Sequence, residues 1–166
     1  MPKPDAIQYL FLHCSDTWWG DVESIRHHHV DVLGWKDIGY HYVITNAWPR
    51  APVRGRTPPD LESDGALHLG RDVDKDGDVE EEIGSHAFGY NDKSLGVCII
   101  GEAGWFTGQQ IGTALKLFRR LMIKYSVPVD RVLGHYESEF AGGKTCPDLN
   151  MDWFRSQRMI QEAFLD

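Results

Sequence analysis

The chain has few cysteines, no long hydrophobic run and fewer basic than acidic side chains. Its 166 residues include 3 Cys, 17 Lys and Arg, and 25 Asp and Glu, which gives a formal net charge of −8. Three cysteines do not build the disulfide framework of a small secreted domain. A nucleic-acid-binding surface needs an excess of basic groups, and a membrane-spanning helix needs about 20 consecutive apolar residues. The composition therefore argues against binding to nucleic acid and against a membrane protein.

The N-terminal residues lack the basic and then apolar layout of a secretory signal. We therefore expect the protein to be made in a cytoplasm and to stay there at first. With 42% hydrophobic residues, a chain of this length is expected to form one domain over residues 1–166 with a genuine core.

Short apolar runs alternate with segments of helical periodicity. Residues 7–12 and 96–101 are almost continuously apolar and predict strands buried on both faces, and residues 41–44 and 131–133 are weaker strand candidates. Helices are expected over 22–33, after a capping box at Thr107 and Gln110, and from about Asn150. The apolar faces of the last two helices are expected to contain Ile111, Leu115, Phe118 and Met122, and Trp153, Ile160 and Phe164. The alternation predicts an α/β fold, with a central mixed sheet flanked by about three helices.

Residues 46–82 break this pattern. Residues 46–64 contain four prolines and three arginines, and an acidic run follows at 72–82. We expect a surface insertion that contributes few side chains to the core and forms part of a substrate rim. Asp72, Asp74, Asp76 and Asp78 match the first half of an EF-hand loop, but the twelfth position is Ile83, where a bidentate Glu is required. A solvated acidic turn is the favoured interpretation, and weak calcium binding is the alternative.

The tract His27–His29 has the composition of a metal site but not its geometry. Consecutive residues on a helix point about 100° apart, so the three side chains cannot converge on one ion. His29 falls on the apolar face of the expected helix, where a buried structural histidine is predicted.

His13, His135 and Cys146 are better candidates for chemistry. His13 ends the first predicted strand and His135 follows the last, and functional groups gather at the carboxyl edge of such sheets. Lys144 and Cys146 share a Gly-rich loop, where a thiolate beside a lysine is a metal ligand or a nucleophile. No local motif ties the three residues together, so a metal site and three unrelated residues both remain open. Cys14 should face away from His13, and with Cys98 it is interpreted as a small buried hydrophobe.

Several sequence blocks occur in a familiar order. They are FLHCS at 11–15, GWKDIGYH at 34–41, GSHAFGYN at 84–91, SLGVCIIG at 94–101, GH at 134–135 and KTCP at 144–147. Together they resemble the zinc N-acetylmuramoyl-L-alanine amidases of phage endolysins, a family related to the peptidoglycan recognition proteins. The resemblance extends from about residue 7 to residue 155 and implies the fold of that family.

The resemblance also implies a function and a set of site residues. One zinc ion per chain would be held by His13, His135 and Cys146, with Tyr40 and Lys144 as catalytic side chains. His86 and Asn91 match a block near the substrate groove and are expected to contact substrate. The implied substrate is bacterial peptidoglycan, cut at the amide between N-acetylmuramic acid and L-alanine after release of the enzyme from the host cytoplasm. The insertion 46–82 is longer than in compact phage members, so the shape of the rim is not implied.

These residue types suit zinc-assisted hydrolysis. Three protein ligands leave the fourth tetrahedral position open, as in catalytic zinc sites. Lys144 would place positive charge beside the developing oxyanion. A tyrosine with a pKa near 10 is a poor free base at neutral pH, so Tyr40 is expected to orient groups and donate a hydrogen bond.

Two other functions remain open from the sequence. One is a thiol amidase or peptidase that uses Cys146 or Cys14 with His135. The other is a peptidoglycan-binding or regulatory protein on the same fold, although the complete ligand set argues against it. The sequence does not decide whether a protein partner, such as a polymerase, is also bound.

Overall fold

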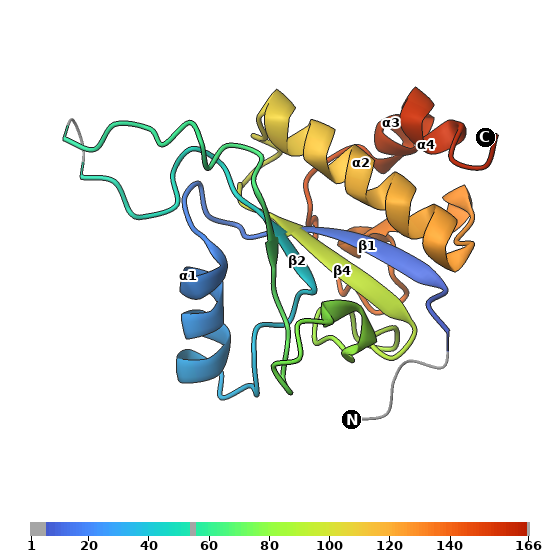
Figure 1. The fold of residues 1–166 in the computed structure, drawn as a ribbon, viewed down its shortest axis with the longest axis horizontal. Helices are drawn as coiled ribbons and strands as arrows, with labels where there is room; N and C mark the ends of the chain where they lie inside the picture. The colour runs from blue at the N-terminus through green and yellow to red at the C-terminus, as the bar shows by residue number, and fades with distance from the viewer. Residues whose placement is uncertain (1–5, 54–55, 166) are drawn as a thin grey trace.

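A five-stranded mixed sheet forms the centre of the molecule in the computed structural model, which describes residues 6–53 and 56–165 (Figure 1). The strands are β1 (Tyr9–Cys14), β2 (Tyr42–Ile44), β3 (Leu67–Leu69), β4 (Ser94–Ile99) and β5 (Val132–Gly134), in the order β3-β2-β4-β1-β5. Every pairing is parallel except that of the edge strand β3, which is antiparallel to β2. The predicted α/β fold with a central mixed sheet is confirmed.

The two central strands, β1 and β4, are the near-continuous apolar runs of the sequence. All of β4 is buried, as expected for a strand covered on both faces. β1 extends through His13 and Cys14, two residues further than predicted, because these residues pair with Cys98 and Ile99 of β4. His13 is therefore part of a rigid strand and does not belong to the loop that follows.

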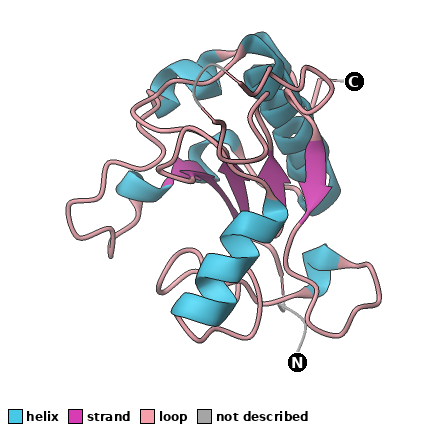
Figure 2. Cartoon of the chain, turned by 90° about the vertical axis from the view of Figure 1, so that its left-hand side faces the viewer, coloured by secondary structure: helices cyan, strands magenta, loops and turns pink. Residues whose placement is uncertain are grey.

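Helices cover both faces of the sheet (Figure 2). On one face lie α2 (Gly108–Tyr125), α3 (Met151–Ser156) and α4 (Arg158–Gln161), and on the other lie α1 (Val22–His27) and a π-helical turn, His28–Val32. Short 3₁₀ turns span Val79–Glu81, Val129–Arg131 and His135–Glu137. The capping box at Thr107 and Gln110 is confirmed. Within the described part of the chain, no helix is long and apolar enough to cross a membrane.

The third predicted helix is broken at Gln157, which has an extended backbone and separates α3 from α4. The break changes which side chains reach the core. Phe154 and Ile160 are buried, whereas Trp153 and Phe164 are about half exposed, at 44% and 54%. The prediction of Trp153 and Phe164 on the buried side is wrong, because two short helices do not share one continuous face.

The insertion 46–82 is only partly a surface feature. Its first part projects from the molecule, but Leu67–Leu69 forms the edge strand β3, and Val79 lies in the main core. Glu80 is buried and forms ion pairs with Arg120 and Lys124. Its carboxylate also accepts hydrogen bonds from the hydroxyls of Tyr42 and Tyr125. The expectation that few of its side chains join the core is therefore wrong for the second half, because cationic and phenolic groups of α2 dock the acidic run.

Candidate metal centre and active site

His13, His135 and Cys146 come together at the carboxyl edge of the sheet. Their ligand atoms all lie within 4.8 Å of one another. The Cys146 Sγ is 3.9 Å from the His13 Nδ1, and the ring centroids of His13 and His135 are 4.7 Å apart. In the sequence, only the resemblance to a family connects these three residues. In the structure, their side chains form one cluster.

The parallel pairing of β1 with β5 explains how the two histidines meet. Leu12 is the register partner of Gly134, so the residues that follow them, His13 within β1 and His135 directly after β5, lie next to each other at the same edge of the sheet. Cys146 is brought to them from the loop before α3. Its carbonyl accepts from the Tyr136 amide at 2.9 Å, and its Sγ accepts from the Cys14 amide at 3.2 Å.

The electrostatics of the cluster favour neutral imidazoles. Burial, followed by the neighbouring His86, holds the pKa of His13 well below its usual value. Burial and the Lys144 charge lower the pKa of His135 to about 4. The hydrogen bond with the Cys14 thiol, together with burial, raises the pKa of the Cys146 thiol. A cation at the cluster would reverse this last effect, since coordination deprotonates a thiol. Two neutral nitrogen donors and one sulfur donor are the ligand chemistry that fits zinc.

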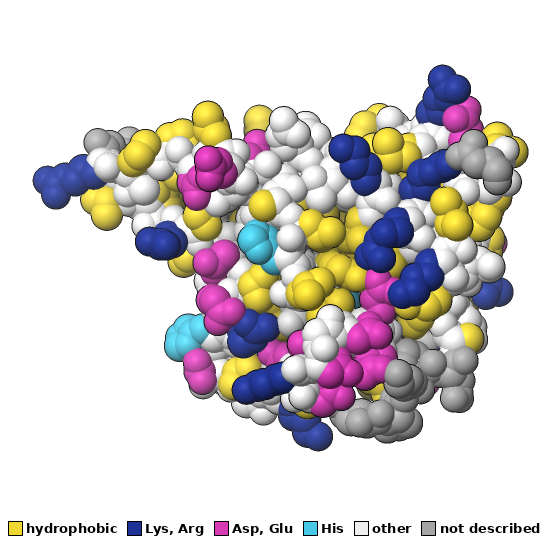
Figure 3. Space-filling model, viewed as in Figure 1, with side chains coloured by type: hydrophobic (Ala, Val, Ile, Leu, Met, Phe, Trp, Pro, Cys, Tyr) yellow, Lys and Arg dark blue, Asp and Glu magenta, His cyan; other side chains and the backbone are white. Residues whose placement is uncertain are grey.

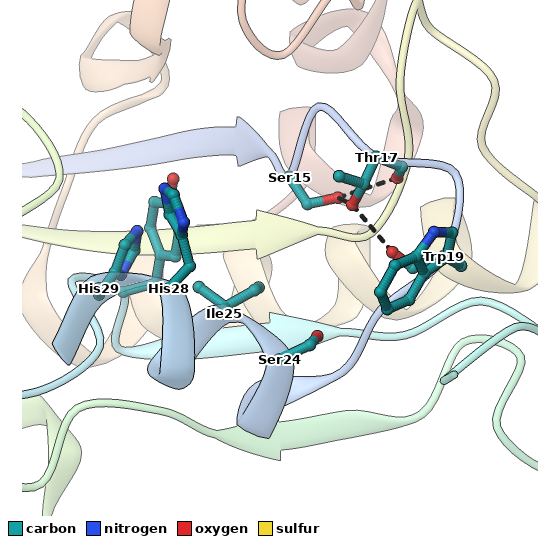
Figure 4. A pocket seen from close by; sticks show the side chains of 8 residues that line it. Ser15, Thr17, Trp19, Ser24, Ile25, His28 and His29 are labelled. Atoms are coloured by element: carbon teal, nitrogen blue, oxygen red, sulfur yellow. Dashed lines mark hydrogen bonds between the residues drawn. The ribbon is translucent and has the colours of Figure 1, made fainter. Parts of the chain in front are cut away.

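Tyr40 borders one side of the cluster. Its ring centroid lies 5.1 Å from that of His13, and burial raises the pKa of its phenol well above the usual value. Tyr40 lines a hollow of 280 Å³ between the loop after β1 and helix α1. Figure 4 shows Ser15 and Thr17 of that loop opposite Ser24 and Ile25 of the helix. The phenol thus offers a proton donor at the edge of an open hollow.

Lys144 borders a second hollow, of 390 Å³, that also contains His135. Its side chain is exposed, and its positive charge helps to lower the pKa of both His13 and His135. Three aromatic side chains line the same hollow, namely Trp35, Phe88 and Phe140. Sequence reasoning gave no role in the site to these aromatics, or to His28, which lines the hollow of Tyr40, because their separate positions show no common pattern before the chain is folded.

His86 and Asn91 line the Lys144 hollow, but their described polar contacts are with the protein itself. The His86 Nδ1 is 3.0 Å from the His13 Nε2, and the Asn91 Oδ1 accepts from the amides of His86 and Ala87. Contact of either side chain with substrate stays a prediction.

The other histidine and cysteine predictions concern buried structural positions. His29 is buried and its Nδ1 accepts from the Gly39 amide, which confirms a structural role. Cys14 and Cys98 are buried as expected. Cys14 nevertheless takes part in the site, through its amide and thiol contacts with Cys146.

The acidic loop brings carboxylates together. Oxygens of Asp72, Asp74 and Glu82 lie within 4.8 Å of one another, as do those of Asp74, Asp76 and Glu81. Hydrogen bonds within the protein already engage this loop, since Asp72 accepts from the Gly77 amide and Glu82 from the Val73 amide. Weak calcium binding here stays a prediction.

Comparison with known proteins places this chain in a family. The family model described as N-acetylmuramoyl-L-alanine amidase matches residues 3–148. The endolysin of Escherichia phage T7 is 31% identical, over 94% of this chain and 91% of that protein. Peptidoglycan-recognition protein SC2 of Drosophila melanogaster is 26% identical, over 78% of this chain and 58% of that protein.

A solved structure shares the fold. The N-acetylmuramoyl-L-alanine amidase LysC from Clostridium intestinale aligns with a TM-score of 0.68 at 23% identity, covering 90% of this chain and 83% of that one. With the family match over most of the sequence, the chain belongs to the N-acetylmuramoyl-L-alanine amidase family of peptidoglycan hydrolases.

Proposed function

We propose that this protein is a zinc-dependent endolysin that hydrolyses the amide between N-acetylmuramic acid and L-alanine in bacterial peptidoglycan. One zinc ion would be held by His13, His135 and Cys146. The observation that carries the proposal is the convergence of these three donors beside two hollows. The T7 relative named as an endolysin supports an enzyme that is made in the host cytoplasm and acts on the wall after release.

Zinc at this site would act as a Lewis acid and lower the pKa of a water molecule toward neutrality. The role of the protein is to provide three ligands and to leave one side accessible. His13 is buried whereas His135 and Cys146 are partly exposed, so the accessible side is that of the latter two residues. Substrate would reach the cluster from the hollows that adjoin it.

Lys144 supplies positive charge where the scissile carbonyl gains negative charge. The hollow that Lys144 lines together with His135 supports this position, because it brings the ammonium to the side from which substrate would approach the cluster. Preorganised charge of this kind stabilises the transition state more than the ground state.

Tyr40 donates a hydrogen bond and orients the reacting groups. Its raised pKa keeps the phenol protonated at neutral pH, so it is suited to donating a proton in a hydrogen bond and unsuited to abstracting one. The 5.1 Å between its ring and that of His13 places the phenol next to the ligand cluster.

Digestion of purified peptidoglycan tests the reaction. We expect new L-alanine amino termini without new reducing sugar ends, and loss of activity on chelation with recovery on adding zinc. New reducing ends would identify a glycosidase and overturn the proposal. Activity that survives chelation would favour a thiol enzyme, and binding without cleavage would favour a recognition protein.

Elemental analysis tests the ligand set. We expect one zinc per chain in the wild type and its loss in Cys146→Ala, with the circular dichroism spectrum retained. Cys98→Ala is the matched control, because Cys98 is a buried thiol that is not part of the ligand cluster. Equal zinc content in both variants would exclude Cys146 as a ligand.

A further inference from the structure

We propose that His86 is a positioning residue that holds His13 in the tautomer and orientation needed to bind the metal through Nδ1. The inference rests on the proposed zinc function and assigns His86 a role other than contact with substrate. It is carried by a hydrogen-bonded chain from His13 through His86 to Ser94, and by two glycines that make room for the His86 ring.

The two nitrogens of His13 face different partners. Nδ1 faces the Cys146 Sγ at 3.9 Å, and Nε2 lies 3.0 Å from the His86 Nδ1. His13 is completely buried and His86 is 7% exposed, so the hydrogen bond between them lies out of bulk water. A neutral imidazole carries one proton, so ligation through Nδ1 leaves the proton of His13 on Nε2. That N–H can then donate to His86.

The hydrogen bonds beyond His86 indicate which atom is the donor at each step from His13 to Ser94. If the His86 Nδ1 accepts from His13, its Nε2 carries a proton, and this nitrogen lies 3.4 Å from the Ser94 Oγ. The Ser94 hydroxyl donates to the Tyr90 carbonyl at 2.7 Å, which leaves its oxygen free to accept. In the reverse direction the His86 Nε2 would lack a proton beside a hydroxyl whose own proton is already used. The arrangement therefore favours His13 with a bare Nδ1.

Glycines of β4 and of the preceding loop accommodate the His86 ring. A Cβ at Gly96 would lie 2.5 Å from the His86 Cγ, and a Cβ at Gly84 would lie 2.5 Å from its Cδ2. Glycine in the interior of a central strand weakens it and often marks a close approach by another group. Here the ring of His86 occupies the space that a side chain at position 96 would fill.

The backbone of His86 is also held in place. The Asn91 Oδ1 accepts from the amides of His86 and Ala87 at 2.8 and 2.9 Å. The ring of His41 lies on another side, with its centroid 5.4 Å from that of His86, and His41 is itself anchored by the Gly96 amide and the Glu82 carbonyl. Because the His86 ring is fixed by these contacts, it can fix the orientation of the His13 ring. Groups that hydrogen-bond a metal ligand in this way raise the affinity of the site for the metal.

Zinc affinity of the full-length protein tests the inference. Metal-free protein would be titrated with zinc against a chromophoric chelator, comparing wild type with His86→Leu, His86→Gln and Gly96→Ala. Loss of a group behind a ligand typically weakens metal binding by about 10- to 100-fold. We expect a loss of that size for His86→Leu, a smaller loss for His86→Gln because its amide oxygen can still accept, and a loss for Gly96→Ala because the methyl group displaces the ring.

Matched controls separate positioning from a general effect on folding. His27→Leu removes an exposed histidine of α1 and should leave zinc affinity unchanged. The thermal midpoint of each metal-free variant shows whether it is folded, and His86→Gln serves if His86→Leu is not. Nitrogen-15 NMR of the His13 ring in the zinc-bound protein gives a direct result, which we expect to be a proton on Nε2 and none on Nδ1.

The outcomes distinguish this inference from the proposed function. Failure of the wild type to bind zinc would overturn both. Wild-type zinc binding with equal affinity in folded His86→Leu would overturn only the positioning role, as would a His13 ring that binds zinc through Nε2. A raised KM with unchanged zinc affinity would return His86 to the role of a substrate contact.

Discussion

Tyr40 and Lys144 border the same ligand cluster from different environments. The Tyr40 phenol is enclosed enough that burial raises its pKa, whereas the Lys144 side chain is exposed in the hollow of His135. Neither side chain has a described hydrogen bond that the fold depends on. Their contribution can therefore be measured by single substitutions that leave the core intact.

Lys144→Ala should lower kcat by about 10²- to 10³-fold, the usual cost of removing one oxyanion-stabilising group. Tyr40→Phe should also slow turnover, because it removes only the hydroxyl and keeps the ring beside His13. Zinc content should stay at the wild-type value in both variants. Steady-state kinetics and elemental analysis measure the two quantities, and Lys116→Ala on the exposed side of α2 is the control. An unchanged kcat would remove the assigned roles while leaving the metal ligands in place.

At the scale of elements, local signals in the sequence predicted most of the helices and strands. The capping box before α2 and the apolar runs of β1 and β4 depend on neighbouring residues only, so they are readable from the sequence. β3 was missed because its two leucines are exposed and only the edge of β2 makes it a strand. The break at Gln157 was also missed, since no proline or glycine marks it in the sequence.

The site divides in the same way. The grouping of His13, His135 and Cys146 could be predicted because the blocks around them resemble a family. The close approach of Gly96 to His86 could not be predicted, because it joins a strand to a separate loop through tertiary packing. The docking of Glu80 on α2 was missed for the same reason, since its partners lie about 40 residues away.

Glu80 links the 3₁₀ turn Val79–Glu81 to α2 through its carboxylate. Removing the charge of this carboxylate should destabilise the fold. Burial opposes ionisation of this carboxyl, but hydrogen bonds from Lys124, Tyr125 and Tyr42 outweigh it and lower the pKa to about 2. Glu80→Gln should therefore lower the free energy of unfolding at pH 7 by about 2 kcal/mol, the scale for hydrogen bonds to a charged group. Urea denaturation measures the change, with exposed Glu139→Gln as the control.

The effect should depend on pH in a defined direction. The pKa of Glu80 in the folded protein, about 2, is below its reference value of 4.5. Its stabilising contribution is therefore complete above about pH 4.5 and is lost as the pH falls toward 2. The wild type and Glu80→Gln should converge in stability over that range. A difference that stays constant down to pH 2 would show that the charge of Glu80 is not the source of the stabilisation.

At the scale of the whole molecule, the outer part of the insertion is separable from the domain. The Asp60 amide donates to the Ala47 carbonyl at 2.8 Å, so the two ends of the projecting segment are joined by a hydrogen bond. Figure 3 shows basic side chains at its outer end, and Arg50 and Arg56 are both exposed. The projection can therefore influence binding of a substrate that carries carboxylates without supporting the core.

Replacing residues 49–59 by a short Gly-Ser linker should weaken binding to peptidoglycan by about two- to tenfold, since exposed charges contribute up to about 1 kcal/mol each. The thermal midpoint should change little. Pull-down on purified peptidoglycan at low and high salt measures the effect, which should be smaller at high salt because surface charges are screened. Arg50→Ser with Arg56→Ser is the charge-only control. Unfolding of the linker variant, or unchanged binding at low salt, would contradict a rim role for this segment.

The order of the three proposed ligands along the chain limits when a complete zinc site can first form. His13 belongs to the first strand, but β4 and β5 must be in place beside that strand before His13 and His135 share an edge. The last of the proposed ligands, Cys146, follows His13 by 133 residues, and Lys144 lies two residues before it. Contacts between such distant parts of a chain form late in folding, because a long loop must close first. If these three residues are the ligands, a growing polypeptide has no complete zinc site until residue 146 has been synthesised, and a product that stops before that residue should not hydrolyse the wall of the cell that makes it.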